Sequence, residues 1–262
     1  MVCFEVMRLG DAKWPELKDL RDKVFVAPLG SLEQHAYHLP LWTDSSIVTA
    51  IADRVEQARA DRIVLAPTQW VGHSPHHRRL GCVSMDLRPY MELVESICRS
   101  LVRIGARRIL LLNGHGGNDI PCKAALRELK SEFEGTRDLY IVYATYWNLA
   151  AQRMSQIRSS PPGGMGHACE METSVMLAIA PESVAMKKAV DVTARDPGGR
   201  ALDMLQKEPY FLIEEFDEVS PSGGIGLPSH ATEEKGRQFL EAAVSATVAF
   251  IDEFAQWPER QG

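Results

Sequence analysis

Metal-binding side chains are concentrated in residues 30–44, which read GSLEQHAYHLPLWTD. Glu33, His35, His38 and Asp44 all lie in this segment, directly after an apolar run. Residues i and i+2 of an extended segment face the same side, so Glu33 and His35 are predicted to point at one place. Carboxylate and imidazole donors together suit zinc, manganese or iron(II) better than calcium, which prefers oxygen alone. The segment is therefore a candidate metal site.

Most of the other histidines lie in three further segments with the same setting. Seven of the eight histidines fall in four segments that follow apolar runs, and only His230 lies elsewhere, in GLPSHATEEKG. The three further segments are WVGHSPHH with His73, His76 and His77, NGHGGN with Asn113, His115 and Asn118, and GGMGHACEMETS with His167, Glu170 and Glu172. In open α/β sheets, binding sites form at the carboxyl ends of the strands. We therefore expect these segments to converge.

Four short runs rich in Val, Ile and Leu are predicted to be the strands that position these segments. Continuous apolar runs are typical of strands covered on both faces. The predicted strands are residues 23–30, 62–67, 107–114 and 139–147.

Amphipathic patterns between these runs predict helices at 45–59, 87–104 and 121–133. Asp44, Asp86 and Asn118 stand where N-caps or first-turn residues are expected. The strand-then-helix order predicts an α/β fold with a mostly parallel sheet and helices on both faces.

The remainder of the chain adds two predicted helices, at about 168–180 and 232–257. Residues 181–228 are rich in Gly and Pro and are expected to be irregular. Because the chain has no low-complexity linker and no internal repeat, we expect one domain over residues 1–262.

Composition and cysteine content narrow the partners and sites that are expected of this chain. The chain has 262 residues, 45% hydrophobic and 24% charged, with a net charge of −6, which argues against nucleic acid as the main partner. Its five cysteines are scattered and contain no CxxC pair, which predicts reduced thiols and no thiolate zinc site. No apolar run has the length of a membrane span, and the N-terminal residues lack a signal-peptide pattern. We expect a cytoplasmic protein without a membrane partner.

Several of these residues have simpler interpretations. Asp44 can cap the helix that follows it. NGHGGN can be a phosphate-binding loop, although it lacks the lysine and the glycine spacing of the known loops. A nucleophilic Ser74 is disfavoured because GHSPHH is not a GxSxG elbow. Cys169 is explained as a small residue at a helix start.

Four motifs of this chain together resemble the creatininase (creatinine amidohydrolase) family. The motifs are PLGSLEQHAYHLPLWTD, NGHGGN, GHACEMETS and GGIGLPSHATEEKG, spread over residues 28–236. The resemblance implies a three-layer α/β/α fold, a small-molecule substrate, a paired divalent metal site and a homo-oligomer, often a hexamer.

The resemblance also implies a ligand set. Glu33, His35, Asp44 and His115 match the family's ligands for two divalent ions (zinc, manganese or iron), with Asp44 bridging them. Creatinine-hydrolysing members have a further glutamate ligand two residues after the histidine of NGHGGN, and here that position is Gly117. The resemblance to the broader NGHGGN branch makes Glu172 the expected fifth ligand.

His167 resembles the family's catalytic histidine, which carries a proton to the leaving group. Creatinine-specific members have a tryptophan four residues before it, where this chain has Gly163. His77 matches a family histidine near the substrate, and Ser74 and Trp147 are further expected substrate contacts. His76 and Leu227 occupy positions where many members have acidic residues. These departures concern creatinine as the substrate more than the metal centre.

The combined prediction is a metal-dependent amidohydrolase that cleaves a C–N bond in a small cyclic amide or formamide. A ring-opening hydrolase of a cyclic polyol ketone, of the 3-dehydro-scyllo-inosose type, is one alternative. A non-catalytic metal or small-molecule binding protein is another. An isomerase or lyase acting on a keto-sugar is a third.

Overall fold

A five-stranded parallel sheet lies at the centre of the computed structural model, which describes residues 7–206 and 209–260. The strand order is β1-β3-β2-β4-β5, and every neighbouring pair is parallel. The strands are β1 (Met7–Arg8), β2 (Val24–Leu29), β3 (Ile63–Leu65), β4 (Arg108–Asn113) and β5 (Tyr140–Thr145).

Side chains alternate between the two faces of the sheet and enter two separate hydrophobic cores. On β2, Val24 and Val26 belong to one core, and Phe25, Ala27 and Leu29 belong to the other. Successive side chains of a strand point to opposite faces, so a strand that is apolar throughout has to be covered on both. The apolar runs of the sequence therefore require helices on each side.

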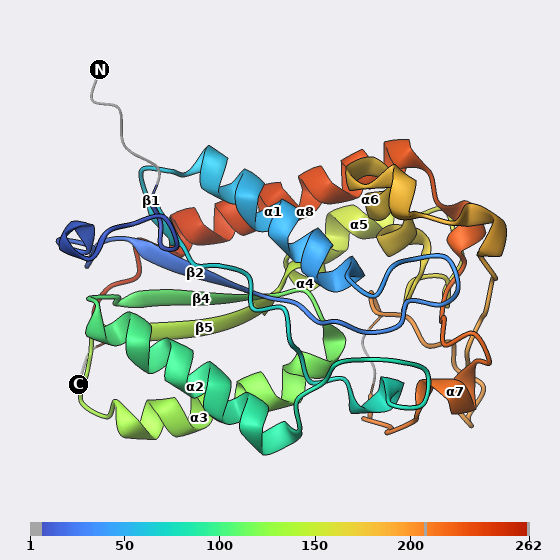
Figure 1. The fold of residues 1–262 in the computed structure, drawn as a ribbon, viewed down its shortest axis with the longest axis horizontal. Coiled ribbons are helices and arrows are strands. Elements are labelled where there is room, and N and C mark those ends of the chain that lie inside the picture. The colour runs from blue at the N-terminus through green and yellow to red at the C-terminus, as the bar shows by residue number, and fades with distance from the viewer. Residues whose placement is uncertain (1–6, 207–208, 261–262) are drawn as a thin grey trace.

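Helices cover both faces of the sheet, as Figure 1 shows. On one face lie α1 (Thr43–Ala58), α4 (Tyr146–Leu149), α5 (Ala151–Ile157), α6 (Glu170–Ile179) and α8 (Glu233–Phe254). On the other lie α2 (Leu87–Arg103) and α3 (Asp119–Glu132). The predicted three-layer α/β/α arrangement is confirmed.

The structure differs from the predicted elements in short segments. The strand predicted at 139–147 ends at Thr145, because Tyr146 and Trp147 begin α4. The two-residue β1 and the short α4 and α5 were not predicted, since so few residues carry no readable periodicity. Residues 181–228 are largely irregular, as predicted, but include the one-turn helix α7 (Phe216–Val219).

Helices α6 and α8 approach each other closely at Gly236. A Cβ at this position would lie 1.8 Å from the carbonyl oxygen of Ser174 on α6. Glycine inside a helix costs about 1 kcal/mol relative to alanine, yet here it permits the contact. The close packing holds α6, which carries Glu172, against α8.

The central strands end at the same level. Leu29 of β2 is in register with Asn113 of β4, which is in register with Thr145 of β5. The loops that follow β2 and β4 therefore start side by side at one edge of the sheet, where the polar segments were expected.

Two further findings concern the sequence-based expectations. Cys82, Cys98, Cys122 and Cys169 are free thiols, and Cys3 lies outside the described residues. No helix in the described part of the chain is long and apolar enough to cross a bilayer.

Candidate metal centre

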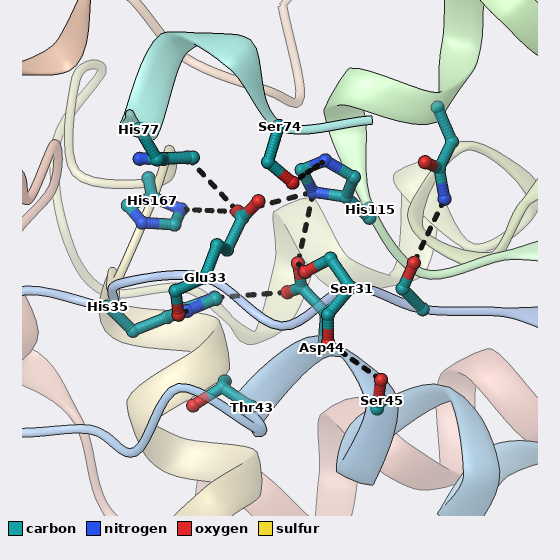
Figure 2. Close-up of polar contacts among 12 residues, drawn as sticks. Ser31, Glu33, His35, Thr43, Asp44, Ser45, Ser74, His77, His115 and His167 are labelled. Carbon is teal, nitrogen blue, oxygen red and sulfur yellow. Dashed lines mark hydrogen bonds and ion pairs between the residues drawn. The ribbon is translucent and has the colours of Figure 1, made fainter. Parts of the chain in front are cut away.

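Glu33, His35, Asp44 and His115 meet at the carboxyl edge of the sheet (Figure 2). Glu33 and His35 come from the loop after β2, Asp44 from the first turn of α1, and His115 from the loop after β4. All four side chains are buried, with exposed fractions of 0–4%.

Asp44 lies at the centre of this group. Its Oδ1 is 3.0 Å from His35 Nε2, and its Oδ2 is 3.1 Å from His115 Nδ1. Ser31 Oγ also donates to Oδ2 at 2.7 Å. The N-cap of α1 is Trp42, and Asp44 lies inside the first helical turn, so Asp44 is not the helix cap of the alternative interpretation.

Two sets of three ligand atoms share Asp44. One set combines Glu33, Asp44 and His115, and the other combines His35, Asp44 and Glu172. Within each set the atoms lie within 4.8 Å of one another. A carboxylate that belongs to both sets can bridge two ions.

The second nitrogen of each ligand histidine candidate is held by the backbone. His35 Nδ1 donates to the Glu33 carbonyl oxygen at 3.1 Å, and His115 Nε2 donates to the His73 carbonyl oxygen at 3.1 Å. A carbonyl can only accept, so the opposite nitrogens, which face Asp44, are the ones left for a metal. Metal-ligating histidines characteristically have such an outer partner.

The electrostatics of the centre also suit a cation. Burial lowers the pKa of His35, but the Asp44 carboxylate outweighs burial and raises it to about 9. Burial raises the pKa of Glu33, and the nearby His115 and His77 outweigh it and hold that pKa well below its ordinary value. The negative charge that favours a proton on His35 would also attract a divalent ion bound at the same place.

Two observations test whether these residues fit a metal. Glu33 Oε2 is buried without a hydrogen-bond partner among the described residues. An unpaired buried carboxylate oxygen is costly, and a cation would satisfy it. Burial also raises the pKa of Glu172 to about 7 against the opposing charge on His35, and a cation bound there would favour the ionised carboxylate. The residues present fit divalent ions.

His167 and His77 lie beside Glu33 (Figure 2). His77 Nε2 is 3.1 Å and His167 Nδ1 is 3.9 Å from Glu33 Oε1. Burial, reinforced by the positive charge on His35, holds the pKa of His167 well below its ordinary value. His167 is therefore neutral near pH 7 and able to accept a proton.

The asparagines of NGHGGN connect three loops. Asn118 accepts from the backbone N–H of His73 at 3.0 Å and donates to the Gly30 carbonyl oxygen at 3.1 Å. Asn113 donates to the His115 carbonyl oxygen at 2.7 Å. These bonds fix the loops after β2, β3 and β4 relative to one another, so the motif forms a scaffold for the ligands.

Gly117 has no space for a side chain. A Cβ there would lie 2.1 Å from the His73 carbonyl oxygen and 2.5 Å from His115 Nε2. A glutamate at this position is incompatible with the loop as folded, whereas Glu172 reaches the His35 and Asp44 side from α6.

The structure places the other predicted site residues as follows. Ser74 is buried with its hydroxyl 3.2 Å from His115 Nε2. Trp147 is nearly buried in the core on the α1 and α8 side, with its ring against Tyr146.

Four polar residues of the predicted clusters have other partners. His38 is bonded to Thr173, His73 to the Met85 carbonyl oxygen and His230 to Ser159. Glu170 pairs with Lys235 at 2.7 Å.

Phe216 is a site residue that the sequence did not reveal. Its ring centroid lies 4.4 Å from that of His77, 4.9 Å from His76 and 5.0 Å from His167. It also lines a cavity of about 130 Å³ together with Ile225, whose backbone pairs with His167. Nothing in the Gly- and Pro-rich segment marked this phenylalanine. The sequence likewise contained no sign of the role of Ser31, although this residue directly follows Gly30 at the end of β2.

The chain matches the creatininase family model, described as creatinine amidohydrolase, over residues 10–251. It is 29% identical to the creatinine amidohydrolase of Pseudomonas putida, covering 94% of this chain and 96% of that protein. It is 31% identical to a mycofactocin precursor peptide peptidase of Mycobacterium ulcerans, covering 94% and 88%. A 3-dehydro-scyllo-inosose hydrolase of Thermotoga maritima is 26% identical, covering 86% and 77%.

Solved structures agree with the sequence relatives. A crystal structure of creatinine amidohydrolase superposes with a TM-score of 0.79 at 27% identity, covering 97% of this chain and all of that one. A creatininase mutant described as Zn–Zn type has a TM-score of 0.76 at 28% identity, covering 94% and 96%. With the family model matched over most of its length and its ligand candidates gathered at the sheet edge, the chain belongs to the creatininase family of amidohydrolases.

Proposed function

We propose that this protein hydrolyses a C–N bond in a small cyclic amide or formamide at a centre of two divalent ions. Glu33, His35, Asp44, His115 and Glu172 would hold the ions. The observation that carries the proposal is the position of Asp44, whose two carboxylate oxygens face His35 and His115 from within two ligand sets. The mixed oxygen and nitrogen donors suit zinc, manganese or iron(II).

Divalent ions bound there would polarise the substrate carbonyl and make a water easier to deprotonate. His167 is the group that moves the proton. Its Nδ1 faces Glu33 at 3.9 Å, and its lowered pKa keeps it able to accept. We infer that His167 takes a proton from the attacking water and returns it to the departing nitrogen, as a general base and then a general acid.

The substrate is proposed to lie on the side of His77 and Phe216. The packing of the Phe216 ring against His77 and His167 supports this side. Ser74 and Trp147 remain proposed substrate contacts. The contact of Ser74 with His115 Nε2 also supports an orienting role for its hydroxyl.

A peptide amide is a second candidate substrate. Its support is the 31% identity to a peptide peptidase and an exposed apolar segment just before α7. In that segment Phe211 is 68% and Ile213 is 79% exposed, a few residues from Phe216. A peptide could extend from the histidines across this surface, whereas a small lactam could not reach it.

The direct test is turnover by the purified protein loaded with zinc or manganese. We expect hydrolysis of at least one member of a panel of lactams, formamides and short peptides, with release of an amine or a carboxylate. The mass of the product distinguishes the alternatives: hydrolysis adds one water, while isomerase or lyase action on a keto-sugar does not. A cyclic polyol ketone belongs in the panel, because ring opening by hydrolysis would also add water.

Metal analysis of the same sample completes the test. Stoichiometric metal with no turnover of any panel member would favour a binding protein over an enzyme. The expected homo-oligomer, hexameric in the family resemblance, is tested by light scattering of the same sample. The cytoplasmic location likewise stays a prediction.

A further inference from the structure

We propose that Gln34 is a positioning residue that determines which ring nitrogen of His77 carries the proton and that orients His77 and His167 around Glu33. Gln34 lies between two ligand candidates in the sequence, and its side-chain amide lies 2.8 Å from His77 Nδ1. It is 6% exposed. The catalytic consequence of this role rests on the proposed function, while the role itself does not.

Two backbone groups fix the orientation of the Gln34 amide. The N–H of Ala36 donates to Gln34 Oε1 at 2.8 Å, and Gln34 Nε2 donates to the Gly223 carbonyl oxygen at 3.0 Å. A backbone N–H can only donate and a carbonyl can only accept. The oxygen and the nitrogen of this amide therefore cannot be exchanged without losing both bonds.

The fixed amide in turn determines the tautomer of His77. Gln34 Nε2 donates its second hydrogen to His77 Nδ1 at 2.8 Å. Nδ1 must then carry the lone pair, so the proton of the neutral ring lies on Nε2. His77 Nε2 is 3.1 Å from Glu33 Oε1 without hydrogen-bond geometry, so this proton lies beside the carboxylate proposed as a metal ligand.

The backbone of Gln34 does the same for His167. His167 Nε2 donates to the Gln34 carbonyl oxygen at 2.7 Å. Both amide hydrogens of Gln34 are already used, so the 3.1 Å approach of its Nε2 to His167 Nε2 adds no hydrogen bond. The Nε2 proton leaves His167 Nδ1 as the atom that exchanges a proton with the reactants.

Gln34 also joins segments that are far apart in the chain. It links the loop after β2 to His77 and to Gly223. The residues after Gly223 pair with His167 through two backbone bonds with Ile225, of 2.6 and 2.8 Å. One residue thus ties together, through its side chain and its backbone carbonyl, the three segments that carry Glu33, His77 and His167.

The test uses two variants of equal size. Gln34→Met removes the donor and the acceptor. Gln34→Glu keeps an acceptor for Ala36 but replaces the donor to His77 Nδ1 with an oxygen. Magic-angle-spinning NMR of zinc-loaded protein labelled with ¹⁵N-histidine reads the protonation of each ring nitrogen, and His77→Gln identifies the His77 signals.

In the wild type we expect His77 with a protonated Nε2 and an unprotonated Nδ1. Gln34→Glu should invert this pattern, and Gln34→Met should produce a mixture of tautomers. With an amide that the wild type hydrolyses as substrate, both variants should have a kcat roughly 10- to 100-fold lower, with little change in KM and with zinc content retained. This is the usual effect of losing a hydrogen-bond partner outside the residues that bind the metal. Gln152→Met, at an exposed position of α5, is the control and should leave both readouts unchanged.

The proposal is overturned if wild-type His77 carries its proton on Nδ1. It is also overturned if the His77 signals of both variants are the same as those of the wild type. If Gln34→Met fails to fold, Gln34→Glu alone decides the point. A wild type that turns over no amide would refute the proposed function, and the His77 signals would still decide the role of Gln34.

Discussion

At the residue scale, both candidate ligand sets depend on Asp44. We expect Asp44→Ala to lower metal content and turnover together, because neither ion would keep three protein ligands. Elemental analysis of the purified protein and kcat measured on the same sample check this. Asp53→Ala is a matched control, since Asp53 lies on the same helix and pairs with Arg8 at 2.9 Å, away from the centre.

Retained metal in Asp44→Ala at wild-type stoichiometry would show that the aspartate is no ligand. Loss of metal from the Asp53 control would instead point to damage of α1.

His167 is expected to behave differently from the ligands. His167→Ala should keep the metal and slow turnover roughly 10²- to 10⁴-fold, the usual contribution of a general acid or base. The reason is that its closest ring nitrogen stands 3.9 Å from the Glu33 carboxylate, while its other nitrogen is held by the backbone. Metal content measured beside kcat distinguishes the two roles, and a His167→Ala protein without metal would make His167 a ligand.

At the scale of elements, α6 and α8 are joined by one buried ion pair. Lys235 Nζ lies 2.7 Å from Glu170 Oε1, and the Glu170 side chain is fully buried. We expect Lys235→Met to destabilise the fold by an amount near the lower end of about 3–5 kcal/mol, because it leaves a buried carboxylate without its cationic partner. Urea unfolding checks this. Arg237→Met, which removes exposed pairs on the same helix, should have little effect.

The same pair has a predictable pH dependence. Burial raises the pKa of Glu170, but Lys235 and the two serine contacts outweigh it and lower that pKa below 4.5. In the wild type this stabilisation is therefore present above pH 4.5 and is lost as the pH falls through the lowered value. In Lys235→Met the carboxyl group loses its cationic partner and keeps only the serine contacts, so its pKa should rise and the stability gap between the two proteins should narrow as the pH is lowered from 7. A gap that stays constant with pH would exclude Glu170 as its cause.

At the scale of the whole molecule, the ligand candidates come from the loop after β2, from α1, from the loop after β4 and from α6. A metal that binds only the folded state stabilises it by mass action, by about 2.7 kcal/mol at one hundred times the Kd. We expect a chelator to lower Tm and added zinc to restore it in a concentration-dependent way. Asp44→Ala should show no such response, and a wild type indifferent to chelator and zinc would argue against a metal centre.

Long apolar runs and periodic helices were predictable, because many residues contribute to each pattern. The four main strands and the helices α1, α2, α3, α6 and α8 lie close to their predicted ranges. The exceptions are short: β1 has two residues and α4 has four. In such segments tertiary contacts decide the conformation, which is why Trp147 lies in a helix although it ends a strand-like run.

The amino-acid sequence by itself determined the family, the layered fold and the residue types of the centre. Those features depend on local patterns and on motif spacing. Only the tertiary structure decided which atoms face each other: that Asp44 lies between His35 and His115, that Gly117 has no room for a side chain, and that Gln34 holds His77. Phe216 joins the site from a segment without periodicity. The physical reason is that contacts between residues far apart in the chain are set by packing and hydrogen-bond geometry, which leave no signature in the neighbouring sequence.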